Sequence, residues 1–321
     1  MNMRECFDNG NTIMIEGALG VRLRGEYDVH PDAVVANASL IYEARARAAM
    51  KEIYGQYMAI ADQYNFPIML MTPTRRANRY NVERSSYGEE IIRDNVNFLK
   101  GVREESVRKG NIRNDIYIGA LMGCMGDAYK ATEVLSEKDA YEFHSWQAKL
   151  FAGEQVDFLY AGIMPAMSEI LGMARAMGDT GIPYIISFMV RNNGRLIDGT
   201  TIHDAIKLVE DTVRIKPMTY MANCIHPRNL ELALSQEFNR TKLVQMHFTG
   251  IQANASPLSP EELDGCCEMI TTDPAELAQG MLELRDRYKL RIFGGCCGTN
   301  QFHMEELAKR LSSRSESIDD R

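Results

Sequence analysis

Short apolar runs alternate with longer amphipathic stretches along most of the chain. Each apolar run has the length of a buried strand, and the stretch after it carries apolar residues every three or four positions, as on one face of a helix. This regular alternation is typical of parallel strands connected by helices. Eight strands are predicted, at residues 12–15, 66–71, 116–121, 156–161, 184–188, 218–222, 243–246 and 290–293.

The stretches between these runs predict helices, and two of them have recognisable starts. Ser136 precedes Asp139 by three residues, as in a capping box, and Pro274 follows Asp273 in the tolerated first turn. The predicted helices cover residues 32–64, 88–109, 136–153, 167–177, 201–214, 225–236, 273–288 and 301–311, and the polar residues 312–321 are expected to fray.

Eight strand–helix units predict an α/β fold, a single (β/α)8 TIM barrel that spans residues 1–321. No linker or change of composition divides the chain into two domains. The structural alternative is an open doubly wound sheet, but the first predicted strand is not followed by a Gly-x-Gly-x-x-Gly turn.

Composition narrows the choice of partners and of compartment. The 321 residues are 45% hydrophobic and 25% charged, as in ordinary globular proteins. A net charge of −8 disfavours nucleic acid and anionic membranes as partners. The first residues do not resemble a signal peptide, and seven cysteines, an odd number, favour reduced thiols. We therefore expect a cytoplasmic protein.

The most informative cysteines follow the ends of two predicted strands. Cys296 and Cys297 stand between glycines after the last strand, and Cys224 follows the sixth. Strand ends of a TIM barrel meet at one mouth, so the three thiolates predict a zinc site with one open position. Such a soft site favours a thiol and would make it nucleophilic, which suits alkyl transfer to sulfur. The alternative is that these cysteines are small buried apolar residues.

Several motifs together resemble those of the homocysteine S-methyltransferase family. They are Glu16–Gly20, Asn223-Cys224 and residues 294–299, with further similarity at 187–188, 194–196 and 253–254. The resemblance implies a zinc-dependent barrel in which Cys224, Cys296 and Cys297 bind Zn²⁺. It also implies that Glu16 and Gly17 lie beside the substrate. Thr72, Gly162 and Asn223 are further expected substrate contacts.

Two departures from the family pattern concern the substrate. Gly162 stands where the family usually has a glutamate that holds the ammonium of homocysteine, and Pro73 stands where asparagine is common. Arg75 and Arg76 follow in the same loop. We interpret this shift of charge as a hypothesis for an anionic thiol without an amino group. The alternatives are that the arginines are solvated loop charges, or that Glu16 or Glu169 replaces the missing carboxylate.

The predicted activity is zinc-dependent transfer of a methyl group to a thiol, with homocysteine as the leading acceptor and methionine as product. The alternatives are the same chemistry on an anionic thiol, or a thiol-binding component that works with a methyl-corrinoid protein. Candidate donors are a methyl-sulfonium compound, betaine, a methylated folate and a methyl-corrinoid, and the last would have to arrive on a separate protein. The sequence does not predict the oligomeric state.

Three further features have weaker functional interpretations. Cys266 and Cys267 form a second adjacent pair in the loop after the seventh predicted strand, and could be an alternative metal pair. His226 and His247 stand near the ends of the sixth and seventh predicted strands. For both histidines we expect hydrogen-bonded structural roles.

Overall fold

The computed structural model describes residues 1–110, 112–258, 262 and 271–319. Eight parallel strands form a closed barrel in chain order, with β8 paired to β1. The predicted TIM barrel is therefore confirmed. The strands are β1 (Ile13–Ile15), β2 (Ile68–Met71), β3 (Ile116–Gly123), β4 (Phe158–Met164), β5 (Tyr184–Phe188), β6 (Thr219–Ile225), β7 (Phe248–Ala253) and β8 (Ile292–Gly295).

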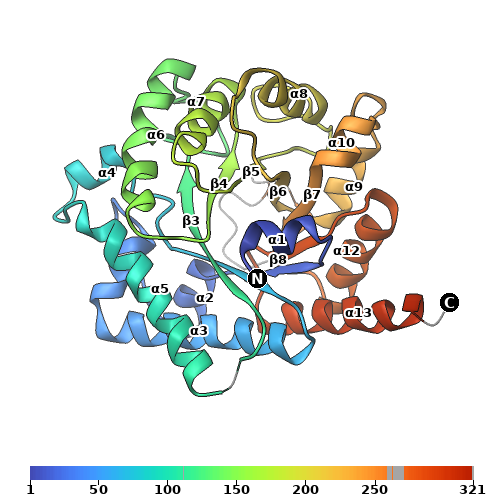
Figure 1. Ribbon diagram of the computed structural model, residues 1–321, viewed down its shortest axis with the longest axis horizontal. Helices are drawn as coiled ribbons and strands as arrows, with labels where there is room; N and C mark the ends of the chain where they lie inside the picture. Colours follow the sequence, from blue (N-terminus) through green and yellow to red (C-terminus); the bar gives the residue numbers. More distant parts are fainter. Residues whose placement is uncertain (111, 259–261, 263–270, 320–321) are drawn as a thin grey trace.

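Helices surround the barrel on all sides (Figure 1). Buried apolar residues of the helices and of the outward faces of the strands form one continuous core layer. The helices are α1 (Met3–Asp8), α2 (Gly20–Tyr27), α3 (Ala44–Gln63), α4 (Arg79–Arg84), α5 (Glu90–Arg108), α6 (Glu137–Ala152), α7 (Met167–Gly178), α8 (Ile202–Thr212), α9 (Pro227–Ser235), α10 (Lys242–His247), α12 (Pro274–Tyr288) and α13 (Gln301–Asp319), with 3-10 turns η1 (Asn37–Tyr42) and η2 (Glu237–Asn239).

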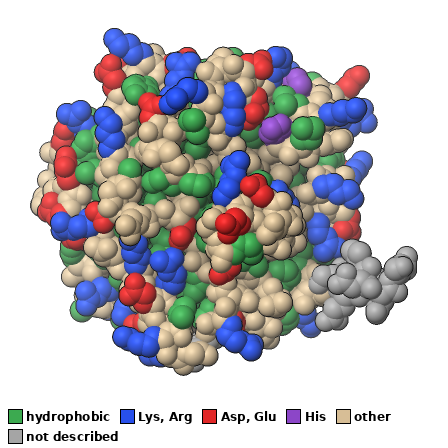
Figure 2. Space-filling view, viewed as in Figure 1, with side chains coloured by type: hydrophobic (Ala, Val, Ile, Leu, Met, Phe, Trp, Pro, Cys, Tyr) green, Lys and Arg blue, Asp and Glu red, His purple; other side chains and the backbone are tan. Residues whose placement is uncertain are grey.

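Helix α1 covers the end of the barrel at which the strands begin (Figure 1). Its buried residues Met3, Cys6 and Phe7 pack against the side chains inside the barrel. No helix was predicted here, because a segment of six residues is too short to show a helical period. On the face that α1 covers, basic and acidic side chains are interspersed (Figure 2).

Side chains fill the barrel interior below the mouth. Tyr117, Phe158 and Tyr160 are buried there together with Met69 and Met71. A side chain at Gly119, in β3, would collide with the Phe158 ring and the Met71 sulfur. The interior is thus a packed core, and open space remains at the carboxyl ends of the strands, as in other barrels of this kind.

The prediction for the seventh strand is wrong. Residues 243–246 belong to helix α10, which Thr241 caps by accepting a hydrogen bond from the Val244 amide, and the strand is Phe248–Ala253. A four-residue apolar run does not distinguish a strand from a short helix. His247 consequently lies before β7 rather than near its end, so its expected position was also wrong.

Other differences concern boundaries. The helix expected at residues 32–64 is split into η1 and α3, with Ala36 in the left-handed region at φ 50°. Strand β6 is longer than expected and includes Cys224. Helix α13 continues to Asp319, so the tail that we expected to fray is helical to that residue. Within the described residues, the structure contains no helix long and apolar enough to cross a membrane.

Candidate active site

Cys224, Cys296 and Cys297 come together at the mouth of the barrel. Cys224 is near the end of β6, and the other two follow β8 directly. Their sulfur atoms all lie within 4.8 Å of one another, and the Sγ atoms of Cys224 and Cys297 are 3.8 Å apart. With zinc–sulfur bonds of about 2.3 Å, tetrahedral geometry separates two sulfurs by about 3.8 Å. The donor atoms therefore fit a zinc ion.

The backbone at Cys224 departs from a regular strand. Cys224 has φ 61°, a left-handed conformation that L-residues rarely adopt, and the pairing of β6 with β7 shifts register at this point. A residue held in this conformation by its surroundings is common at functional sites. The irregular backbone is therefore that of a residue whose sulfur belongs to the cluster.

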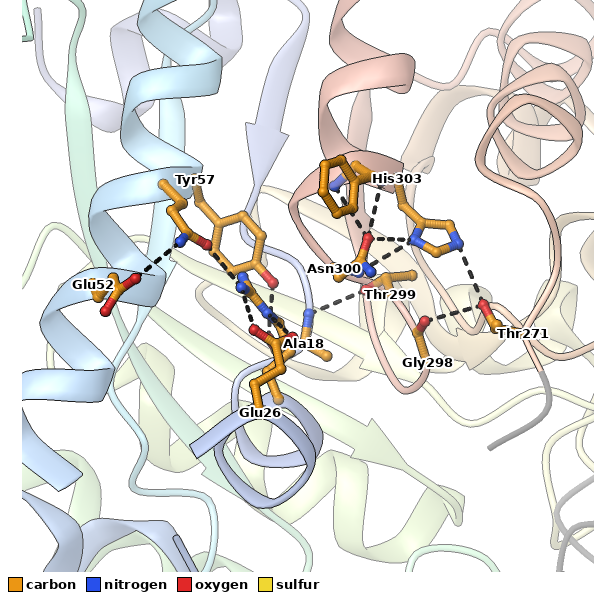
Figure 3. A network of polar contacts seen from close by, with 12 residues as sticks. Ala18, Glu26, Glu52, Tyr57, Thr271, Gly298, Thr299, Asn300 and His303 are labelled. Atoms are coloured by element: carbon orange, nitrogen blue, oxygen red, sulfur yellow. Dashed lines mark hydrogen bonds and ion pairs between the residues drawn. The ribbon is translucent and has the colours of Figure 1, made fainter. Parts of the chain in front are cut away.

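Hydrogen bonds from neighbouring loops hold the segment with Cys296 and Cys297. The Thr299 hydroxyl donates to the Cys296 carbonyl oxygen at 2.7 Å and accepts from the Ala18 amide at 3.1 Å. The Tyr57 hydroxyl donates to the Ala18 carbonyl oxygen at 2.8 Å. Figure 3 shows this network, which connects α3, the loop after β1 and the loop after β8. The cysteine pair is therefore fixed relative to the first strand.

A second group of contacts holds the start of α13. Asn300 Oδ1 accepts hydrogen bonds from the amides of Phe302 and His303, and the His303 ring contacts Thr271 (Figure 3). The same ring also contacts the Thr272 carbonyl oxygen. These contacts connect the start of α13, which follows the loop after β8, to residues 271 and 272.

The three thiols share their protons unequally. Hydrogen bonds with Cys296 and Cys297 hold the pKa of Cys224 well below its usual value. Hydrogen bonding to Cys224 is the main cause that raises the pKa of Cys297 to about 12, and the pKa of Cys296 is raised as well. Without a cation, the cluster thus favours one thiolate and two thiols. A bound divalent cation would be needed to hold three thiolates together.

Tyr129 and Asn254 also contact Cys224. The Tyr129 hydroxyl lies 3.1 Å from Cys224 Sγ, and Asn254 Nδ2 donates to the same sulfur at 3.7 Å. Tyr129 comes from the loop after β3 and is half-buried. Sequence reasoning missed it, because a tyrosine in a polar loop carries no signal of where the loop folds.

A cavity of about 350 Å³ opens beside the cluster. Cys296 and Cys297 line it together with four expected substrate contacts: Glu16, Gly17, Thr72 and Asn223. Cys224 borders a separate cavity of about 110 Å³. Most of the site residues predicted from the sequence therefore line one cavity. Their contact with a substrate stays a prediction.

Gly162 is buried in β4 and is not among the residues that line the larger cavity. A Cβ atom there would lie 2.8 Å from Leu121 Cδ1 and 3.3 Å from Tyr160 Cε1. Both of these neighbours line the cavity. A longer side chain at position 162 would therefore point toward the cavity and displace the end of Leu121.

The polar side chains of the expected contacts are already engaged within the protein. Thr72 Oγ1 accepts a hydrogen bond from the Leu121 amide at 3.1 Å. Glu16 Oε2 accepts from the Met71 amide at 2.6 Å, and burial raises the pKa of the Glu16 carboxyl well above its usual value. These groups shape the cavity more than they offer free charge to a ligand.

The hypothesis that Glu169 supplies the missing carboxylate is not supported. Glu169 is on α7, is 1% exposed and does not line the cavity. Its Oε1 atom accepts from the Met125 amide at 2.7 Å and lies 2.9 Å from His144 Nε2. Its contact with the Met125 amide holds the loop after β3 in place.

The other residues singled out in the sequence lie elsewhere or outside the described residues. A further cysteine, Cys124, directly follows β3, is buried and does not belong to the sulfur cluster. His226 caps α9, as its Nδ1 accepts from the Arg228 amide at 3.2 Å. The expected structural role of His226 is confirmed. The pair Cys266-Cys267 lies outside the described residues.

Comparisons with known proteins agree with this geometry. The family model described as homocysteine S-methyltransferase matches residues 13–311. Among solved structures, the homocysteine methyltransferase MmuM from Escherichia coli matches in its metallated form with a TM-score of 0.77 and 18% identity. That match covers 96% of this chain and 99% of the other.

The oxidized form of the same protein matches with a TM-score of 0.77 and 19% identity, again over 96% and 99% of the two chains. At this identity the likeness to MmuM concerns the fold. No curated protein matched the sequence. The family model, which covers most of the chain, confirms the expected family.

Proposed function

Because the chain belongs to the homocysteine S-methyltransferase family and is a thiol S-methyltransferase, we propose that its methyl transfer depends on zinc bound by Cys224, Cys296 and Cys297. The observation that carries this proposal is the convergence of the three sulfurs within 4.8 Å at the cavity. When bound, Zn²⁺ supplies a Lewis acid that keeps an acceptor thiol deprotonated near neutral pH.

The residues around the cluster have complementary tasks. The three cysteines would hold the cation, and Cys296 and Cys297 line the cavity in which an acceptor thiol would bind. The contacts of Tyr129 and Asn254 with Cys224 fix the orientation of one ligand. Thr299 fixes the main chain at Cys296. A methyl-accepting sulfur is thereby held at a constant place relative to the cavity.

The reaction requires a second small molecule as methyl donor. The acceptor thiol loses its proton to solvent, and its sulfur then forms a bond to the methyl carbon. The bond between that carbon and the leaving atom of the donor breaks, and its electron pair stays with the donor. A methyl-sulfonium or methyl-ammonium compound, a methylated folate or a methyl-corrinoid each provides such a leaving group. A methyl-corrinoid would be carried by a separate protein.

Homocysteine is the leading acceptor, because it is the acceptor in the description of the family model. The product would then be methionine, and the enzyme would act in methionine biosynthesis in the cytoplasm. The second candidate is an anionic thiol, which the charge around the cavity favours. Two residues carry this second reading: Arg75 lines the cavity, and Gly162 offers no carboxylate.

Metal analysis of the purified protein tests the proposal. We expect about one zinc per chain in the wild type, because the three sulfurs form one site. Cys224→Ala, Cys296→Ala and Cys297→Ala should each lose most of it. Cys124→Ala, which removes a buried cysteine outside the cluster, is the matched control and should keep full zinc. Full zinc retention in the three cluster variants would refute the ligand assignment.

Turnover separates an enzyme from a thiol-binding component. Zinc-loaded protein is mixed with homocysteine and, in separate reactions, with each class of free donor. Methylated thiol in amounts well above one per chain supports an enzyme that acts alone. Product only after addition of a methylated corrinoid protein supports the component that depends on a partner.

A further inference from the structure

Arg75 is a half-buried cation at the cavity. It lies in the loop after β2 and lines the same space as Cys296 and Cys297. It makes no hydrogen bond or ion pair with the residues that the structure describes. Its neighbour Arg76, in contrast, donates to the carbonyl oxygens of Met125 and Gly126 at 3.2 and 3.1 Å. A guanidinium that is partly removed from water without a partner is costly, so an anionic ligand would satisfy it.

A glycine makes room for this arginine. A Cβ atom at Gly123, the last residue of β3, would lie only 2.6 Å from Arg75 Cγ. Gly123 is the register partner of Gly162 in β4. A Cβ atom at Gly162 would meet Leu121 and Tyr160, which line the cavity together with Arg75. The stem of Arg75 therefore lies against the end of β3, and the neighbouring strand carries no side chain at position 162.

Arg75 and the sulfur cluster border the space in which a small molecule would bind. The cavity of about 350 Å³ is lined by Arg75 together with Cys296 and Cys297. One short molecule in this cavity can therefore place its sulfur toward the cysteines and an anionic group toward the guanidinium.

The cavity offers little to an ammonium group. Among the described residues that line it, Glu16 is the acidic one, against Arg24, Arg75 and Arg76. Glu16 is 7% exposed, and its Oε2 atom already accepts from the Met71 amide. Burial also favours its neutral form. An amino acid would therefore place its ammonium group in a cavity whose described lining residues include three arginines and a single, buried carboxyl group.

We propose that the acceptor is a short aliphatic thiol that bears a carboxylate or sulfonate and no ammonium group, and that Arg75 binds this anionic group. The inference rests on the zinc-dependent methyl transfer to a thiol proposed above. Of the two acceptors named there, it takes the anionic thiol in place of homocysteine. The cluster binds the sulfur, the guanidinium binds the anion, and Gly123 leaves room for the stem of the arginine.

Arg75 has one rival role, that of a counter-charge for the thiolates. Matched thiols distinguish the two roles. Calorimetric titration of the zinc-loaded protein compares 3-mercaptopropionate and 2-mercaptoethanesulfonate with neutral 2-mercaptoethanol, cationic cysteamine and homocysteine. A charged hydrogen bond contributes about 1.5–3 kcal/mol, or about 10- to 150-fold in affinity. We expect the two anionic thiols to bind at least about tenfold more tightly than the other three.

The variant Arg75→Gln should abolish this preference. The anionic thiols should lose about tenfold or more in affinity, and 2-mercaptoethanol should change by less than about threefold. Arg75→Lys keeps the charge without the planar fork and should recover part of the preference. Arg79→Gln removes an exposed arginine paired with Glu83 on α4, outside the cavity lining, and is the matched control.

The outcomes separate this inference from the proposed function. Equal loss for anionic and neutral thiols in Arg75→Gln would mean that Arg75 is a counter-charge, and would overturn the inference while thiol binding stands. Tighter binding of homocysteine than of the mercapto-acids to the wild type would overturn it as well. If zinc is bound and none of the thiols binds, the proposed function fails and the inference fails with it.

A change at position 162 gives an independent test. Gly162→Glu introduces a carboxylate beside Leu121, whose flexible end can move, and Gly162→Gln has the same size without the charge. We expect Gly162→Glu to bind homocysteine more tightly than Gly162→Gln, and to bind the mercapto-acids more weakly. Equal affinities of the two variants for both kinds of thiol would contradict the proposed charge preference of this end of the cavity.

Discussion

The Oδ1 atom of Asn223 accepts a hydrogen bond from the main-chain amide of Ile163 at 2.9 Å. This hydrogen bond lies beside two residues in the left-handed backbone conformation. Ile163 itself has φ 56°, and Asn223 precedes Cys224, which has φ 61°. The same oxygen accepts from the Ser187 hydroxyl at 2.6 Å, so one amide connects the ends of β4, β5 and β6. Asn223 was expected to contact the substrate, and this geometry gives it a second task in positioning Cys224.

Replacing Asn223 by alanine should destabilise the metal-free protein by about 3 kcal/mol, because two buried donors lose their acceptor at about 1–3 kcal/mol each. Urea unfolding measures the change. Ser187→Ala removes one donor and leaves the contact with Ile163, so its loss should be smaller, about 1 kcal/mol. If the two variants lose the same free energy of unfolding, the bond to Ile163 contributes nothing to the fold.

The buried carboxyl of Glu16 should make stability depend on pH. Burial raises its pKa in the folded protein, so the unfolded chain releases this proton at lower pH than the folded one. The contribution to stability is therefore fully present below the unfolded pKa, near 4.5, and is lost as pH rises toward the folded pKa. Glu16→Gln keeps an acceptor for the Met71 amide without the charge.

We expect Glu16→Gln to raise the midpoint of thermal unfolding relative to the wild type more at pH 8 than at pH 5. Thermal scans of the metal-free proteins at both pH values measure this difference. A constant difference between the two proteins across this range would mean that the Glu16 carboxyl titrates normally in the folded state.

His226 should act in the opposite direction. Burial lowers its pKa from 6.5 to about 4, and its Nδ1 must be unprotonated to accept from the Arg228 amide. The unfolded chain binds the proton first, so stability is complete above pH 6.5 and decreases as pH falls toward about 4. Asparagine is a good N-cap that does not titrate. In His226→Asn, the loss of thermal stability between pH 6.5 and 4 should be smaller than in the wild type, and an unchanged loss would assign it to other groups.

Zinc binding should release protons. In the metal-free cluster the pKa of Cys296 is raised, and hydrogen bonding to Cys224 raises that of Cys297 to about 12, whereas hydrogen bonds with both cysteines lower the pKa of Cys224. We therefore expect about two protons per zinc near pH 7.5, and an affinity that rises with pH. Calorimetry in buffers with different ionisation enthalpies measures the number. Binding without proton release would mean that the metal is held elsewhere.

Removal of the metal should also lower thermal stability, because a cation that binds only the folded protein stabilises it by mass action. Scans before and after treatment with a chelator measure the shift, and re-addition of zinc should restore it. Cys297→Ala is the internal control, since its unfolding should respond little to the chelator.

Much of the site could be predicted from local pattern. Seven of the eight apolar runs mark a buried strand, and parallel strands of a barrel end at one mouth. Cys224 and the pair at 296–297 could therefore be brought together without coordinates, and the sulfur distances agree with that reasoning. The prediction went wrong at residues 243–246, because four apolar residues fit a helical turn as well as a strand.

The sequence by itself determined the barrel and the placement of the three sulfurs, because periodicity and strand-end position are local properties of a chain. The family followed from the resemblance of its motifs. Tertiary structure alone decided what surrounds those sulfurs. That Tyr129 touches Cys224 depends on how a loop folds, and that Arg75 has no described partner depends on every neighbour at once. Gly162 illustrates both levels: the missing side chain is visible in the sequence, whereas its pairing with Gly123 beneath Arg75 follows from the register of β3 and β4.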